Sequence, residues 1–248
     1  MLLLFLSCLS AGLAAKSYDD HRVVRCTAEN RAQLDVLHRL EEKNDFSLDI
    51  WREARRIGSP VDMMVSSKHY AGLSNFLSRE GIQCETMIEN VSDVIKGERG
   101  ARKVGRKDAS FFSDYHNSTE VQAYMESLAF EFSELATTDV IGQTYQGADQ
   151  QIIRLSTAPN TYKKALWFDG GLHAREWVSV ATVTYLADAI LRGYGTDEDA
   201  TALLDKFDVI ICPILNVDGY DYTWAEDGDR MWRKPRSPND KSPCVGTD

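Results

Sequence analysis

The spacing of apolar residues predicts a small domain of mixed helices and strands in the first part of the chain. Six segments alternate between strand and helix periodicity, in the order strand 21–27, helix 28–43, strand 46–53, strand 61–66, helix 68–79 and a β-rich stretch 82–95. This succession is that of the ferredoxin-like motif. We therefore predict a ferredoxin-like α+β domain over residues 16–98.

The apolar pattern of residues 108–248 predicts a second, α/β domain. Its elements are expected as helix 119–135, strands 139–145, 151–156 and 164–168, helices 177–191 and 197–206, and a last strand 208–215. The last strand is a continuous β-branched run, which is typical of a strand covered on both faces. A strand, a helix and a buried strand in succession are the elements of an α/β fold.

The charge distribution supports this division into two domains. The chain has 248 residues and a net charge of −10, with 28 Lys+Arg and 38 Asp+Glu. The acidic excess lies in the second domain, and it argues against a nucleic-acid partner. A basic segment at 99–107 separates the domains. We interpret it as a linker that a trypsin-like protease could cut at Arg99, Arg102 or Arg106, although an ordinary solvated loop has the same composition.

The first fifteen residues predict export from the cell. Residues 1–15 carry no charged side chain and are almost entirely apolar, but they are too few to span a membrane. We expect a cleaved signal peptide and a secreted, extracellular protein without a membrane partner; a buried N-terminal strand is the alternative. Two sequons for glycosylation begin at Asn90 and Asn117.

The cysteines fit an oxidising compartment. Cys26 and Cys84 could form a disulfide within the first domain, but the sequence alone does not fix the connectivity. Cys212 lies within an apolar run, and we expect it to be a buried free thiol.

Candidate metal ligands occur in the segment 167–177, which reads Trp-Phe-Asp-Gly-Gly-Leu-His-Ala-Arg-Glu-Trp. The imidazole of His173 and the carboxylate of Glu176 are suitable zinc ligands, and their spacing lets them converge at a strand-to-helix turn. The two glycines permit a tight backbone path there. The pair follows a strand that we expect to be buried, at the sheet edge where α/β folds place ligands. His-x-x-Glu is by itself a weak pattern, and the alternative is that His173 is an ordinary surface or core residue.

Four motifs resemble the metallocarboxypeptidase A/B family. Residues 171–177, Gly-Leu-His-Ala-Arg-Glu-Trp, resemble its zinc-binding signature. Residues 216–220, Asn-Val-Asp-Gly-Tyr, resemble its Asn-Pro-Asp-Gly-Phe segment with Val in place of Pro. Residues 230–234, Arg-Met-Trp-Arg-Lys, and 244–248, Cys-Val-Gly-Thr-Asp, resemble the two segments that follow. The motifs occur in the family's order, and the resemblance extends over essentially the whole chain.

The resemblance implies a secreted zinc carboxypeptidase zymogen, a hydrolase that releases C-terminal amino acids from peptides. The first domain would be an inhibitory activation domain, and the second would belong to an α/β/α domain around a mixed sheet. His173 and Glu176 match two zinc ligands, and Arg175 matches an arginine that contacts substrate. Arg233 matches the catalytic arginine that binds substrate and polarises the scissile carbonyl, and Asp248 the carboxylate that orients a zinc-ligand histidine.

The resemblance also implies residues that have no counterpart among these 248. A catalytic zinc normally has three protein ligands, and the family's third ligand and catalytic Glu are not matched. We therefore expect the chain to be the N-terminal part of such a zymogen and to be inactive. We also expect the second domain alone to be unstable or prone to aggregation, because half a sheet would leave an unpaired edge. The alternative is a non-catalytic secreted form that acts as an inhibitor or a peptide-binding module.

Overall fold

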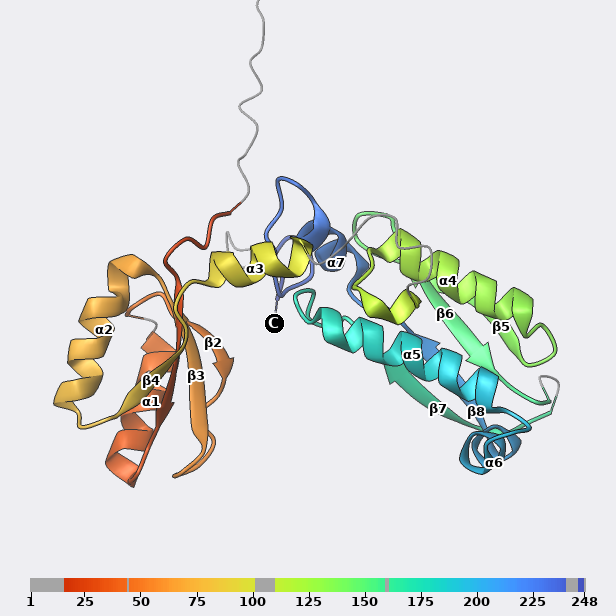
Figure 1. Cartoon of the computed structure of the whole chain (residues 1–248), viewed down its shortest axis with the longest axis horizontal. Helices are drawn as coiled ribbons and strands as arrows, with labels where there is room; N and C mark the ends of the chain where they lie inside the picture. Colours follow the sequence, from red (N-terminus) through yellow and green to blue (C-terminus); the bar gives the residue numbers. More distant parts are fainter. Residues whose placement is uncertain (1–15, 44, 101–109, 159–160, 240–244, 248) are drawn as a thin grey trace, which may run out of the picture. The chain divides into compact units, whose positions relative to one another are not determined.

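The computed structural model describes residues 16–43, 45–100, 110–158, 161–239 and 245–247. The chain divides into two compact units (Figure 1), of which the first is Ser17–Lys103 and the second contains Val104–Asp248. The predicted signal peptide lies outside the described residues. Within the described ranges, no helix has both the length and the apolar character needed to cross a membrane.

The first unit has the predicted ferredoxin-like fold. Its elements are β1 (Arg22–Thr27), α1 (Arg31–Lys43), β2 (Asp49–Arg52), β3 (Pro60–Val65), α2 (Ser67–Arg79), β4 (Cys84–Ile88) and α3 (Val91–Gly100). The four strands form an antiparallel sheet in the order β2-β3-β1-β4. Leu37 of α1 and Leu73 of α2 pack against Val24, Val61 and Met63 of the sheet in one apolar core.

A disulfide joins two neighbouring strands of this sheet. Cys26 of β1 lies directly opposite Cys84 of β4, and the two form a disulfide with a Cα–Cα distance of 4.2 Å. The structure therefore contains the Cys26–Cys84 disulfide, which the sequence alone could not assign. The bond holds the edge strand β4 to the centre of the sheet.

The segment after β4 corrects the sequence prediction. We expected a β-rich stretch to continue to residue 95, but the strand ends at Ile88 and α3 follows. Asn90 starts this helix, because its side-chain oxygen accepts hydrogen bonds from the backbone N of Ser92 at 3.2 Å and of Asp20 at 3.1 Å. Arg99 lies in α3, so the helix extends into the segment that we interpreted as a linker.

The second unit contains a mixed sheet, as predicted. Its elements are the 3₁₀ turn η1 (Phe111–Ser113), α4 (Ser118–Glu131), β5 (Ala136–Gln143), β6 (Asp149–Leu155), β7 (Lys164–Asp169), α5 (Trp177–Gly193), α6 (Glu198–Lys206), β8 (Phe207–Cys212) and α7 (Val217–Trp224). The strand order is β5-β6-β8-β7. The pair β7–β8 is parallel, and the other two pairs are antiparallel. The helices α4, α5 and α6 share one apolar core with β6 and β8.

The two parallel strands differ in burial. In β8, Val209, Ile211 and Cys212 are fully buried, as the apolar run predicted. Cys212 is a free thiol, and burial, followed by the charge of Asp169, raises its pKa to about 11. The prediction that β7 is buried was wrong. Among the strands of the described residues it is the last of the sheet, and its Trp167 is 47% exposed. An apolar run alone does not show whether a strand has neighbours on both sides.

We expect an ion pair in the first unit to make its stability depend on pH. Arg25 donates two hydrogen bonds, at 2.7 and 2.8 Å, to the buried Asp62 on the neighbouring strand. These bonds hold the pKa of Asp62 below its ordinary value. A lowered folded pKa stabilises the fold above the unfolded value of about 3.9, and this contribution is lost as pH falls through the folded pKa.

Substituting Asp62→Asn should therefore lower the unfolding free energy of the first unit by about 1–3 kcal/mol at pH 7, and by less at a pH well below the unfolded pKa of about 3.9. Hydrogen exchange of β1 and β3 peptides at both pH values measures the change. The matched control is Asp35→Asn, because Asp35 pairs with Arg31 on an exposed helix face. Equal effects of D62N at both pH values would contradict the assignment.

Candidate metal centre

The backbone after β7 is held against the backbone after β8. Gly170 N donates to Cys212 O at 3.0 Å, and Leu215 N donates to Gly170 O at 2.8 Å. Asn216 N then donates to Gly171 O at 3.1 Å. The two chain segments therefore stay hydrogen-bonded to each other after β7 and β8 end. These bonds fix the position of Gly170, where the turn begins.

The two glycines are required by this close approach. A Cβ at Gly170 would lie 2.7 Å from Pro213 O and 2.8 Å from Val183 Cγ2. Gly171 has a φ of +62°, a conformation that residues with a side chain rarely adopt. The chain can therefore turn sharply from β7 towards α5 within a few residues.

His173 and Glu176 converge within this turn. The Nδ1 of His173 lies 2.9 Å from Oε1 of Glu176, and the side chains are 27% and 45% exposed. Two ligands of one tetrahedral zinc ion are about 3.4 Å apart when each bond is about 2.1 Å. A small side-chain rotation would thus let both bind one ion, and the nitrogen and carboxylate donors suit zinc. Among the described residues, no group of three or more His, Cys, Asp or Glu side chains is arranged so that it could hold a metal ion.

Arg233 approaches this pair from the loop that follows α7. Its Nη1 lies 3.8 Å from Oε1 of Glu176, and its carbonyl oxygen accepts a hydrogen bond from Ala174 N at 3.0 Å. The loop of Arg233 and the turn of His173 are therefore bonded to each other, although they are far apart in sequence.

Arg175 is held by its backbone. Its carbonyl oxygen accepts a hydrogen bond from Nη1 of Arg230 at 2.9 Å, and the Arg230 guanidinium lies 3.7 Å from the ring centroid of Trp177. Trp177 is buried, and its Nε1 donates to Thr223 of α7 at 2.8 Å. The first residue of α5 is thereby fixed against α7.

The structure thus brings together three predicted site residues, His173, Glu176 and Arg233, and places Arg175 in the same turn. Asp248, Arg102 and Arg106 lie outside the described residues. Asn90 and Asn117 are half-buried and start α3 and α4. The side chain of Asn117 accepts from Glu120 N, and that of Glu120 accepts from Asn117 N.

Sequence reasoning missed helix α7 and the acidic group inside it. Asp218 is buried and accepts hydrogen bonds from Thr144 Oγ1 at 2.5 Å and Gln146 N at 3.0 Å, which ties the β5–β6 turn to α7. The sequence signal that could have predicted α7 was Asn216, because Asn is a common residue at a helix start. In the structure its side chain accepts a hydrogen bond from Gly219 N.

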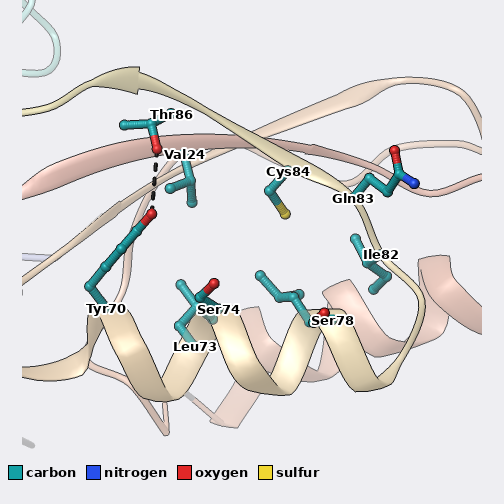
Figure 2. Close-up of a pocket in the computed structure, with 10 residues that line it drawn as sticks. Val24, Tyr70, Leu73, Ser74, Ser78, Ile82, Gln83, Cys84 and Thr86 are labelled. Atoms are coloured by element: carbon teal, nitrogen blue, oxygen red, sulfur yellow. Dashed lines mark hydrogen bonds between the residues drawn. The ribbon is translucent and has the colours of Figure 1, made fainter.

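The first unit contains a cavity of about 320 Å³ between α2 and β4. Figure 2 shows Leu73, Ser74 and Ser78 of α2 facing Thr86 and Cys84 of β4 across it. The residues that line this cavity carry no charge, and Cys84 is oxidised. The cavity therefore lacks the acid, base and metal ligands that the turn in the second unit provides.

Comparison with known proteins identifies the family of this chain. Residues 121–248 match the family model described as zinc carboxypeptidase, and residues 24–98 match the model described as carboxypeptidase activation peptide. The chain belongs to the zinc carboxypeptidase family.

Similar proteins support this membership. Carboxypeptidase A1 of Rattus norvegicus is 34% identical over 97% of this chain and 58% of its own length. Carboxypeptidase B of Bos taurus is 29% identical over 100% of this chain and 59% of its own length. The crystal structure of carboxypeptidase A from Helicoverpa armigera matches with a TM-score of 0.76 and 28% identity, over 92% of this chain and 56% of that one. The chain thus spans less than two thirds of the length of these relatives.

The close approach at Gly170 predicts a specific sensitivity. Gly170→Ala should lower the unfolding free energy of the second unit by about 1–3 kcal/mol, because the added methyl group meets a backbone oxygen that cannot move aside. Gly142→Ala is the control in the same sheet, where an added Cβ would meet only Gln150 at 3.7 Å. Urea denaturation followed by tryptophan fluorescence compares them, and an equal stability of both variants would refute the steric argument.

Proposed function

We propose that this chain forms the activation domain and part of the zinc site of a secreted metallocarboxypeptidase zymogen. The observation that carries the proposal is the convergence of His173 Nδ1 and Glu176 Oε1, 2.9 Å apart, beside Arg233. Membership of the zinc carboxypeptidase family makes zinc the metal for which this pair is suited. The substrate would be the C-terminal residue of a peptide or protein.

The residues have separate tasks in this proposal. His173 and Glu176 would hold the zinc ion, which when bound polarises a carbonyl group and activates water. Arg233 would donate to the oxygen of the scissile carbonyl, where negative charge develops. Arg175 would contact the substrate, and Asp248 would orient a zinc-ligand histidine.

The first unit would keep the enzyme latent until the linker is cut. The match to an activation peptide ends at residue 98, next to the candidate cleavage sites Arg99, Arg102 and Arg106. The disulfide Cys26–Cys84 supports an oxidising compartment and therefore secretion. Glycosylation at Asn90 or Asn117 would agree with the same route.

The metal part of the proposal predicts zinc binding by two residues. The 248-residue chain should bind one Zn²⁺ weakly, and His173→Asn or Glu176→Gln should each abolish measurable binding. Competition with a chromophoric chelator measures the affinity. His69→Asn in the first unit is the control and should bind like the parent chain. Unchanged affinity in both site variants would exclude this pair as the zinc ligands.

The catalytic part predicts latency that trypsin relieves. The product of the complete transcript, read through and beyond the codon for Asp248, should release C-terminal amino acids from peptides only after limited trypsin treatment. A variant with Gln at all six basic positions of the segment, 96, 99, 102, 103, 106 and 107, should stay latent because trypsin cleaves after Lys as well as Arg, whereas Arg79→Gln should be activated like the parent. Full activity before trypsin treatment would contradict the inhibitory role of the first unit. A trypsin-treated product without activity would contradict the enzymatic proposal.

A further inference from the structure

Asn216 lies where the two loops of the site meet. It is buried, at 8% exposed, and it immediately precedes α7. Its side-chain Nδ2 lies 3.4 Å from Leu172 O and 3.4 Å from Arg233 O, and can donate to both. Leu172 directly precedes His173, so one amide group reaches the loop of a candidate zinc ligand and the loop of the candidate catalytic arginine.

The carbonyl oxygen of Arg233 connects the Asn216 amide to the turn of His173 by a second hydrogen bond. The carbonyl oxygen of Arg233 accepts a hydrogen bond from Ala174 N at 3.0 Å. The same oxygen accepts from Nδ2 of Asn216 at 3.4 Å. The residues on both sides of His173 are thereby tied to Arg233, one directly and the other through Asn216. A shift of either loop would break at least one of these bonds.

The other groups of Asn216 are also occupied. Its Oδ1 accepts from Gly219 N at 3.0 Å and starts α7, and its backbone N donates to Gly171 O at 3.1 Å. A Cβ at Gly219 would lie 2.5 Å from Nδ2 and 2.7 Å from Oδ1 of Asn216, so glycine leaves the space that this side chain needs.

We propose that Asn216 is a positioning residue that holds the turn of His173 and Glu176 in register with Arg233. The inference rests on the proposed function in so far as these residues form the zinc site. The task requires one acceptor, for Gly219 N, and two donors, for the two carbonyl oxygens. An Asn side chain supplies all three, whereas Asp has no donor and Ser has only one.

The deciding variant is Asn216→Asp in the full 248-residue chain. Aspartate still accepts from Gly219 N and starts the helix, but it cannot donate to Leu172 O or Arg233 O. We expect the Ala174 amide to exchange about tenfold faster, while the Gly219 amide keeps its protection. The zinc affinity of the chain should fall by about tenfold or more. Nuclear magnetic resonance resolves the two amides, and chelator competition gives the affinity.

Asn30→Asp is the matched control. Asn30 starts α1 by accepting from Gln33 N at 3.0 Å, on the exposed surface of the first unit. The same chemical change there should leave the Ala174 amide and the zinc affinity unaltered. If N216D does not fold, Asn216→Ser keeps an acceptor for the helix start and loses one donor, and it should accelerate Ala174 exchange while sparing Gly219.

Parent-like exchange of Ala174 in a folded N216D chain would overturn the proposal. Equal losses of protection at Ala174 and Gly219 would also overturn it, because they would show only a general destabilisation. Faster Ala174 exchange with no zinc binding in either the parent or the variant would support the positioning of the loops and refute the proposed zinc site. The two proposals can therefore fail separately.

Discussion

The arrangement of the candidate site depends on the contact between β7 and β8 beyond the ends of both strands. Within the sheet, the parallel pairing fixes which residue of one strand lies beside which residue of the other. After the strands end, Gly170 both donates to Cys212 and accepts from Leu215, so the two chains leave the sheet together. This contact is possible only because Gly170 has no side chain. Where the turn of His173 begins is therefore decided by backbone packing and not by the ligands themselves.

The consequence is a site whose parts differ in exposure. Its backbone is held by hydrogen bonds, because Asn216 and the buried Trp177 tie the turn to α7 and to the loop of Arg233. Its candidate ligands and arginine are accessible, since the side chains of His173, Glu176 and Arg233 remain 27%, 45% and 33% exposed. Strand β7 is itself at the edge of the sheet. An exposed functional group on a buried backbone framework is the arrangement that binding sites commonly use.

Local patterns predicted much of this structure, and long-range contacts account for the rest. The six segments of the first domain and the His173–Glu176 pair follow from spacing within a few residues. The helices α3 and α7 were missed because both are short. Each nevertheless starts at an Asn whose side chain accepts from a backbone N two or three residues later, which is a local signal. The place of Arg233 beside Glu176 came only from resemblance to a family. The donors of Asn216 reach carbonyl groups 44 and 17 positions away, which no local spacing reveals.

The two ends of β8 are held by different forces. At its start, the buried Asp208 accepts from Arg154 at 2.5 Å and Ser156 at 2.6 Å. Burial raises the pKa of Asp208, but the hydrogen bonds from Ser156 and Arg154 outweigh it and keep the pKa below its ordinary value. This charged anchor sets the register of β6 and β8, in which a slip of one residue would turn every side chain to the opposite face. At the end near the site, main-chain bonds and the amide of Asn216 join the loop after β8 to the turn of His173, and the guanidinium of Arg230 donates to the carbonyl oxygen of Arg175. The register of the sheet is thus fixed at the start of β8, and the start of the turn of His173 is fixed at its end.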